Sequence, residues 1–133
     1  MDVSTPNLWV VPLAALAAFL VGGLYYAPPL FGTVWQRLCG LTDEQVAGNR
    51  AAVFGGALVA AVIGALVLAF FIGGDAGVGF GALAGALVGV GWVTTSLVTT
   101  YLFERRPMAL ALIDGGYHAA TYTVMGLLIG WLG

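Results

Sequence analysis

The sequence predicts an all-α integral membrane protein, a four-helix bundle with antiparallel neighbours and a short interfacial helix after the first span. The first observation is composition, because 61% of the 133 residues are hydrophobic and only 8% are charged, outside the usual range of soluble domains. The second is a set of four apolar stretches, each long enough to cross a bilayer. They cover residues 8–27, 51–73, 76–103 and 108–132, within a single domain of residues 1–133.

The four basic residues lie in or beside two loops, residues 28–50 and 104–107. By the positive-inside rule, both loops are cytoplasmic and both termini face outward from an inner or plasma membrane. Asp2 and the lack of a basic residue near the start argue against a cleaved signal peptide. A net charge of −2 without a basic patch predicts no nucleic acid partner. The single Cys39 has no partner for an intrachain disulfide, so we expect a reduced thiol.

The end of the first span is marked by Tyr25 and Tyr26, which suit the inner headgroup level, and by Pro28 and Pro29, which stop the helix. Residues 31–38 then carry apolar side chains at i, i+3, i+4 and i+7. This spacing predicts a short helix on the inner membrane surface. The helix is interpreted as a membrane-laid linker, with a gate or a docking element for a partner as the alternative.

Three short sequence patterns predict how the remaining spans are connected. Residues 42–45 match a capping box, and we expect the helix that starts there to continue into the second span. The turn at residues 73–75 is short enough to require an antiparallel hairpin, with the second and third spans as neighbours. Residues 104–107 form a second tight turn, with Pro107 suited to the first turn of the last helix.

The third span carries a glycine ridge followed by hydroxyl residues. Glycine every four residues stays close to one helix face and lets a second backbone approach, which predicts a glycine zipper. Its partner is a helix either of the same chain or of another copy, and we expect a homo-oligomer, a dimer or larger, held through this face. At about 100° per residue, Trp92, Thr95, Ser96 and Thr99 continue this face and Thr94 points the opposite way. The ridge consists of Gly77, Gly81, Gly85 and Gly89.

The last span contains an ionisable pair, Asp114 and His118, about 10 and 16 Å from the preceding loop. Tyr117 and Thr121 share their face by helical spacing. Ser96 and Thr99 count back to similar depths, so we expect one polar layer across two helices. Asp114 and His118 are i and i+4 and can pair directly, and the opposing influences of burial and mutual attraction leave either able to titrate near neutrality.

Several segments together resemble a known family. The residues are the run from Tyr25 to Gly32 with Trp35, then Tyr101 to Glu104, then Gly116, Tyr117, His118, Met125 and Gly126. In this combination the chain resembles the small bacterial membrane proteins grouped as domain of unknown function 1761. The resemblance implies four membrane helices and no established activity. At the position two residues before Gly116, where we expect the family to favour Asn, this chain has Asp114.

Several functions are compatible with these residues. An ionisable group in a membrane helix is paired, protonated or functional by default. Asp114 and His118 therefore serve either a structural layer, bonded to Ser96, Thr99, Tyr117 or Arg50, or a small-solute or proton-coupled carrier, with Tyr117, Thr121, Ser96 and Thr99 as lining. A non-catalytic accessory subunit of a larger membrane complex is the second hypothesis. A membrane enzyme is third and less favoured, since no nucleophile turn is visible. No cofactor is expected, and one His per chain disfavours a metal site.

Overall fold

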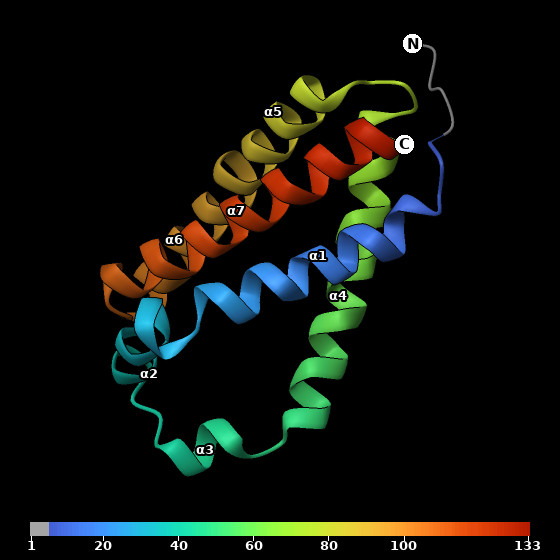
Figure 1. Cartoon of the computed structure of the whole chain (residues 1–133). Helices are drawn as coiled ribbons and strands as arrows, with labels where there is room; N and C mark the ends of the chain where they lie inside the picture. Colours follow the sequence, from blue (N-terminus) through green and yellow to red (C-terminus); the bar gives the residue numbers. More distant parts are fainter. Residues whose placement is uncertain (1–5) are drawn as a thin grey trace.

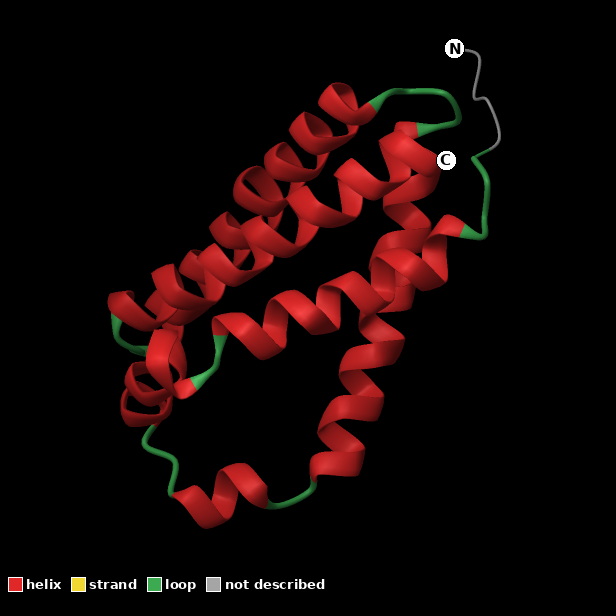
Figure 2. Ribbon diagram, in the orientation of Figure 1, coloured by secondary structure: helices red, strands yellow, loops and turns green. Residues whose placement is uncertain are grey.

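The computed structural model describes residues 6–133, and these form helices joined by short loops, with no strand among them (Figures 1 and 2). The all-helical prediction is confirmed. Asp2, used above to argue against a signal peptide, lies outside the described residues. The elements are α1 (Val10–Tyr25), η1 (Pro28–Gly32), α2 (Thr33–Cys39), α3 (Asp43–Ala47), α4 (Arg50–Ile72), α5 (Val78–Val88), η2 (Gly89–Thr94), α6 (Thr95–Glu104) and α7 (Met108–Leu132), where η marks a π-helical turn.

Two helices are long and apolar enough to cross a membrane, α4 and the continuous helix Val78–Glu104 formed by α5, η2 and α6. A third span results if α1 and Pro28–Cys39, which meet at a bend of 50°, are counted together. The bend follows Pro28 and Pro29, as the sequence predicts. The structure thus supports two or three of the four expected spans, and α7 is not among them.

Helix α7 lies at the centre of the molecule, packed against α1, α4, α5, η2 and α6 (Figure 1). Its buried side chains include Leu110, Met125 and Ile129, each at most 2% exposed. The polar residues of α7 lower its hydropathy, and the more apolar helices around it shield them. The core continues into the contact between the first half of α1 and the second half of α4.

The glycine ridge packs against α7 of the same chain. The Gly77 N–H donates to the Gly130 carbonyl at 3.0 Å, and Gly81 lies against Gly126 so closely that a Cβ on either would overlap the other's carbonyl oxygen. Contact of this kind between glycine faces is how membrane helices approach most closely. The face expected to join copies of the protein is therefore occupied within one chain, and homo-oligomerisation stays a prediction.

Helix α3 begins with the expected capping box, in which Thr42 accepts from the Gln45 N–H and Gln45 accepts from the Thr42 N–H. The prediction that this helix continues into the second span is wrong. Gly48 is extended and Asn49 has a left-handed φ of 56°, so the chain turns before α4 begins.

The second and third spans, expected as antiparallel neighbours, contact each other only in part, with the Phe71 ring of α4 6.1 Å from the Trp92 ring of η2. Helix α5 packs along α7 and has few contacts with α4, because the glycine seam gives it a closer partner. Helix α4 instead leans away from the bundle (Figure 1). Residues 50–60 of α4 are all exposed.

Candidate functional site

The side chain of Asp114 is held between two helices that reach it from opposite ends of the sequence. The Tyr26 hydroxyl donates to Oδ1 at 2.7 Å, and the Tyr101 hydroxyl donates to Oδ2 at 2.8 Å. Hydrogen bonds to a charged acceptor are the stronger class, so each carboxylate oxygen has a well-matched donor. The partners are neutral hydroxyls, and no ion pair to Asp114 is formed by the residues that the structure describes.

The end of α1 is fixed against α7 beside this carboxylate. The Tyr25 hydroxyl donates to the Ile113 carbonyl at 2.6 Å. Gly116 leaves the room for it, because a Cβ at that position would lie 2.6 Å from the Tyr25 oxygen. Since Tyr25 and Tyr26 are consecutive, anchoring one ring to the backbone of α7 directs the other toward Asp114.

Tyr101 reaches Asp114 because of the π turn η2. This turn inserts one residue relative to an α-helix, so every later side chain lies about 100° behind its position in an unbroken helix. Thr94, five residues after Gly89, therefore lies on the glycine face and donates to the carbonyls of Gly89 at 2.8 Å and Gly115 at 3.0 Å. Tyr101 follows Thr94 by two turns and points to the same side. The prediction that Thr94 faces away from α7 is wrong for this reason.

The same shift places the other hydroxyl residues outside the site. Ser96 and Thr99 are exposed and donate back to the carbonyls of Trp92 and Thr95, four residues earlier. Such bonds satisfy a hydroxyl within its own helix. The expected polar layer across two helices therefore forms from tyrosines and Thr94 instead. Trp92 and Thr95 are exposed as well.

The other candidate residues of α7 lie beyond the carboxylate. His118 is half-buried, its ring 4.8 Å from that of Tyr117, and no hydrogen bond joins it to Asp114 in the described structure. The predicted direct pairing of Asp114 with His118 is thus replaced by the two tyrosine contacts. Thr121 is 4% exposed, and within the described residues its hydroxyl has no hydrogen-bond partner.

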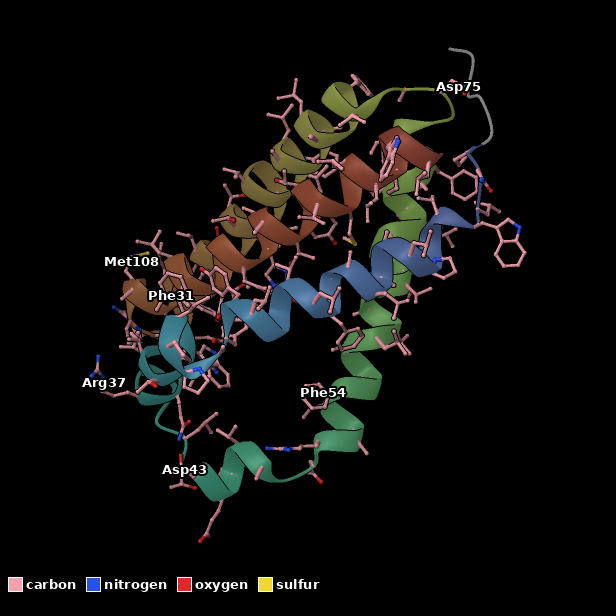
Figure 3. The ribbon with its side chains drawn as sticks, viewed as in Figure 1. Phe31, Arg37, Asp43, Phe54, Asp75 and Met108 are labelled. Carbon is pink, nitrogen blue, oxygen red and sulfur yellow. The ribbon has the colours of Figure 1, made fainter. Side chains whose placement is uncertain are left out.

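Aromatic rings surround the carboxylate on the side of α1 and α2. The Tyr26 ring lies 5.1 Å from Tyr117 and 5.4 Å from Trp35, centroid to centroid, inclined by 57° and 63°. The Tyr25 ring stacks on Phe31 at 4.7 Å. Phe31, labelled in Figure 3, lies where the start of α2 meets α7. The inclined rings present their faces in different directions rather than forming one parallel stack.

The thiol of Cys39, at the end of α2, interacts electrostatically with the Asp114 carboxylate. Burial raises the pKa of this thiol, the Asp114 carboxylate raises it further, and Arg106 lowers it. The Arg106 guanidinium pairs with Glu104 at 2.9 Å and lies 5.4 Å from the centre of the Tyr101 ring. The described residues include no group of three or more His, Cys, Asp or Glu side chains placed to hold a metal ion.

An open cavity of about 660 Å³ adjoins the aromatic rings beside Asp114. Its lining residues come from the second half of α1, from α2, from α3 with its flanking loops, from the first half of α4 and from Tyr117 of α7; Figure 1 shows how these helices are arranged. Tyr26, Trp35 and Tyr117 form its aromatic end. Phe54, labelled in Figure 3, belongs to the α4 wall. Tyr26 thus lies between the cavity and Asp114, because it lines the cavity and its hydroxyl donates to the carboxylate.

Sequence reasoning found Asp114 and missed its partners. Tyr26 was interpreted as a headgroup anchor and Tyr101 only as part of a family motif. Their positions in the sequence could have identified them, because Tyr26, Tyr101 and Asp114 are all predicted near the cytoplasmic side of the membrane. The rotation that brings Tyr101 inward depends on the π turn.

Fold and site together define an all-helical protein with two or three helices long and apolar enough to cross a membrane, in which two tyrosines hold a carboxylate beside an aromatic cavity. The sequence profile described as "protein of unknown function (DUF1761)" matches residues 9–130, so the chain belongs to this family. The family expected from the sequence is therefore confirmed. No curated protein and no solved structure matches the chain.

Proposed function

We propose that this protein is a four-span membrane carrier for a small solute, with the cavity as its binding site and Asp114 as its proton-active group. Helix α7 has 25 residues and is therefore about 37 Å long, enough to cross a hydrocarbon core of about 30 Å. Its polar side chains are shielded by the surrounding helices. The distribution of basic residues supports cytoplasmic loops at residues 28–50 and 104–107 and both termini outside.

The arrangement of Asp114 is the observation that supports this function best. A carboxylate within a membrane helix is a candidate functional site by default. Because Asp114 is bonded to hydroxyls alone, its charge has no fixed counter-ion among the described residues. A bound solute or a proton can then supply the missing positive charge. This exchange is the property that couples a proton to a solute in one site.

The cavity supports the same function by its size and its connection to the carboxylate. Its volume of about 660 Å³ lies in the range of roughly 300–1,000 Å³ typical of small-molecule sites. Tyr26 both lines the cavity and donates to Asp114. A solute that displaces the Tyr26 ring therefore changes the hydrogen bonding of the carboxylate. His118 is a second candidate for proton exchange.

The test is uptake by proteoliposomes under pH gradients of either direction. Labelled tetraethylammonium, glutarate and mannitol represent cationic, anionic and neutral solutes. We expect the wild-type protein, and not Asp114→Asn, to accumulate at least one of them in response to a gradient. If folded wild-type protein accumulates none, the carrier function is rejected.

A nitrogen-15 signal from the single His118 gives an independent measurement of proton exchange. In lipid nanodiscs between about pH 5 and 9, around the reference value of roughly 6.5, we expect this signal to titrate. Its midpoint should shift in Asp114→Asn because the two groups interact electrostatically. A signal that stays constant in both proteins would identify the cluster as structural.

An accessory subunit of a larger membrane complex is the second candidate. It is favoured by α4, whose residues 50–60 are all exposed although the helix is highly apolar. Unrelated subunits that copurify at fixed stoichiometry would support this candidate. A second copy of the chain on the same surface would instead support the predicted homo-oligomer, formed through α4 rather than through the glycine ridge.

A further inference from the structure

We infer that the cavity selects an amphiphilic organic cation, such as a quaternary ammonium or phosphonium compound with apolar substituents. This inference rests on the proposed function and names the class of its solute. It depends on three features of the described residues: the aromatic faces at one end of the cavity, the carboxylate behind them, and the apolar character of the remaining walls.

The aromatic end is suited to a cation. Tyr26, Trp35 and Tyr117 line the cavity, and the Tyr26 ring is inclined by 63° to Trp35 and by 57° to Tyr117. Inclined rings are not stacked face on face, which leaves ring faces available to a ligand. Contact of a cation with one such face tightens binding by about two- to thirtyfold, with the upper end for sites that exclude water.

The charge around the cavity has the matching sign. Asp114 is bonded to the hydroxyl of Tyr26, whose ring lies in the wall, so its negative charge is one side chain away from the ligand. No lining residue in the described part of the chain carries a formal charge. The nearby Arg106 is paired with Glu104. An anion would therefore meet repulsion from Asp114 and no compensating cation in the wall.

The rest of the cavity is apolar, which requires a ligand with apolar substituents. Its α1 and α4 walls include Phe19, Phe54 and Ala57, and its polar groups are concentrated at the aromatic end and at α3. A small, strongly hydrated cation would lose its water without replacement at these walls. A bulky cation with hydrocarbon groups gains apolar contact there while its charge lies near Tyr26.

Tritiated tetraphenylphosphonium is the probe, and tritiated tetraphenylborate, an anion of the same shape, is the matched control. Binding of each is measured in separate samples to the full chain in nanodiscs of phosphatidylcholine, with empty nanodiscs subtracted. We expect saturable binding of the cation and none of the borate. Asp114→Asn should weaken it at least tenfold, and Trp35→Leu about two- to thirtyfold, the range of one cation–π contact.

Two substitutions in α4 test whether the cation binds in the cavity. Ala57 and Ala52 are both exposed on α4, and of the two only Ala57 lines the cavity. We expect Ala57→Phe to abolish binding and Ala52→Phe to leave it unchanged. The inference is overturned if both variants lose binding of the cation equally, or if Ala57→Phe still binds it. It is also overturned if the wild-type protein binds tetraphenylborate as well as the cation, or shows no saturable binding of the cation.

The outcome is separable from that of the uptake assay. If tetraphenylphosphonium binds as described and no solute accumulates, the cation site stands and the carrier function fails. If glutarate or mannitol accumulates while the cation does not bind, the carrier function stands and the assignment of solute class fails.

Discussion

The seam between α5 and α7 can be tested by adding one methyl group at Gly85. An alanine Cβ there would lie 2.7 Å from the carbonyl carbon of Tyr122, closer still to its oxygen, and 3.1 Å from the Cα of Thr123. These atoms are backbone and cannot rotate away, so the two helices must separate by roughly 1 Å or more before the Tyr122 oxygen reaches ordinary contact in a close-packed interior. Overpacking of this kind costs about 1–3 kcal/mol.

Matched controls isolate that cost from the intrinsic effect of alanine. Gly→Ala in a helix is itself favourable by up to about 1 kcal/mol. Gly79 of α5 and Gly56 of α4 are exposed, and a Cβ at either meets nothing within 4 Å. We therefore expect Gly79→Ala and Gly56→Ala to be as stable as wild type or more stable, and Gly85→Ala to be about 1–3 kcal/mol less stable than both.

The assay is equilibrium unfolding in dodecylmaltoside micelles with a rising fraction of dodecyl sulfate, followed by tryptophan fluorescence. Because the seam lies within one chain, the midpoint should not depend on protein concentration. Two results would refute the reasoning: Gly85→Ala within about 0.5 kcal/mol of the controls, or a destabilisation that disappears as protein concentration rises, which would place the glycine contact between copies.

Three further perturbations address the site. Because the pKa of the Cys39 thiol is raised in part by the Asp114 charge, Asp114→Asn should lower that pKa, enlarge the thiolate fraction at pH 8 and speed alkylation by iodoacetamide; an unchanged or slower rate would contradict this. Tyr101→Phe removes one donor to the carboxylate and should destabilise the protein by about 1.5–3 kcal/mol in the same unfolding assay, whereas a loss below about 0.5 kcal/mol would show that the bond is unimportant. Deletion of Gly91 from η2 removes the inserted residue, so the turn should become α-helix with Thr94 and Tyr101 still on the face toward α7; Tyr101→Phe should therefore destabilise the shortened protein as much as the full-length one, and no effect of Tyr101→Phe in that background would argue against the insertion.

The contact made by the glycine ridge followed directly from the sequence, whereas its partner did not. Spacing of four residues keeps Gly81 and Gly85 near one face, and a face without side chains requires a close neighbour. Which neighbour it meets depends on a second small-residue face. Gly126 and Gly130 supply that face in α7, and their four-residue spacing was a usable signal in the sequence.

The partners of Asp114 could not be derived from periodicity alone. Projection at 100° per residue assumes an unbroken α-helix, and η2 breaks that assumption by one residue. A π turn has no reliable sequence signature, because its weaker backbone bonding is compensated by tertiary contacts that exist only in the folded chain. Tyr26 posed a different difficulty, since a tyrosine near a helix end suits a headgroup anchor and a buried donor equally well.

The two donors to Asp114 both depend on irregular backbone, and this links the site to the fold. Tyr26 lies just before the bend at Pro28, and Tyr101 lies two turns beyond η2. In a regular bundle of straight helices, Tyr101 would point away from α7. Irregular turns weaken backbone hydrogen bonds, which is unfavourable where water is scarce, so they persist where another interaction compensates. Here the compensating interactions are the two hydrogen bonds to Asp114, because each donor lies close to one of the two segments that deviate from α-helix.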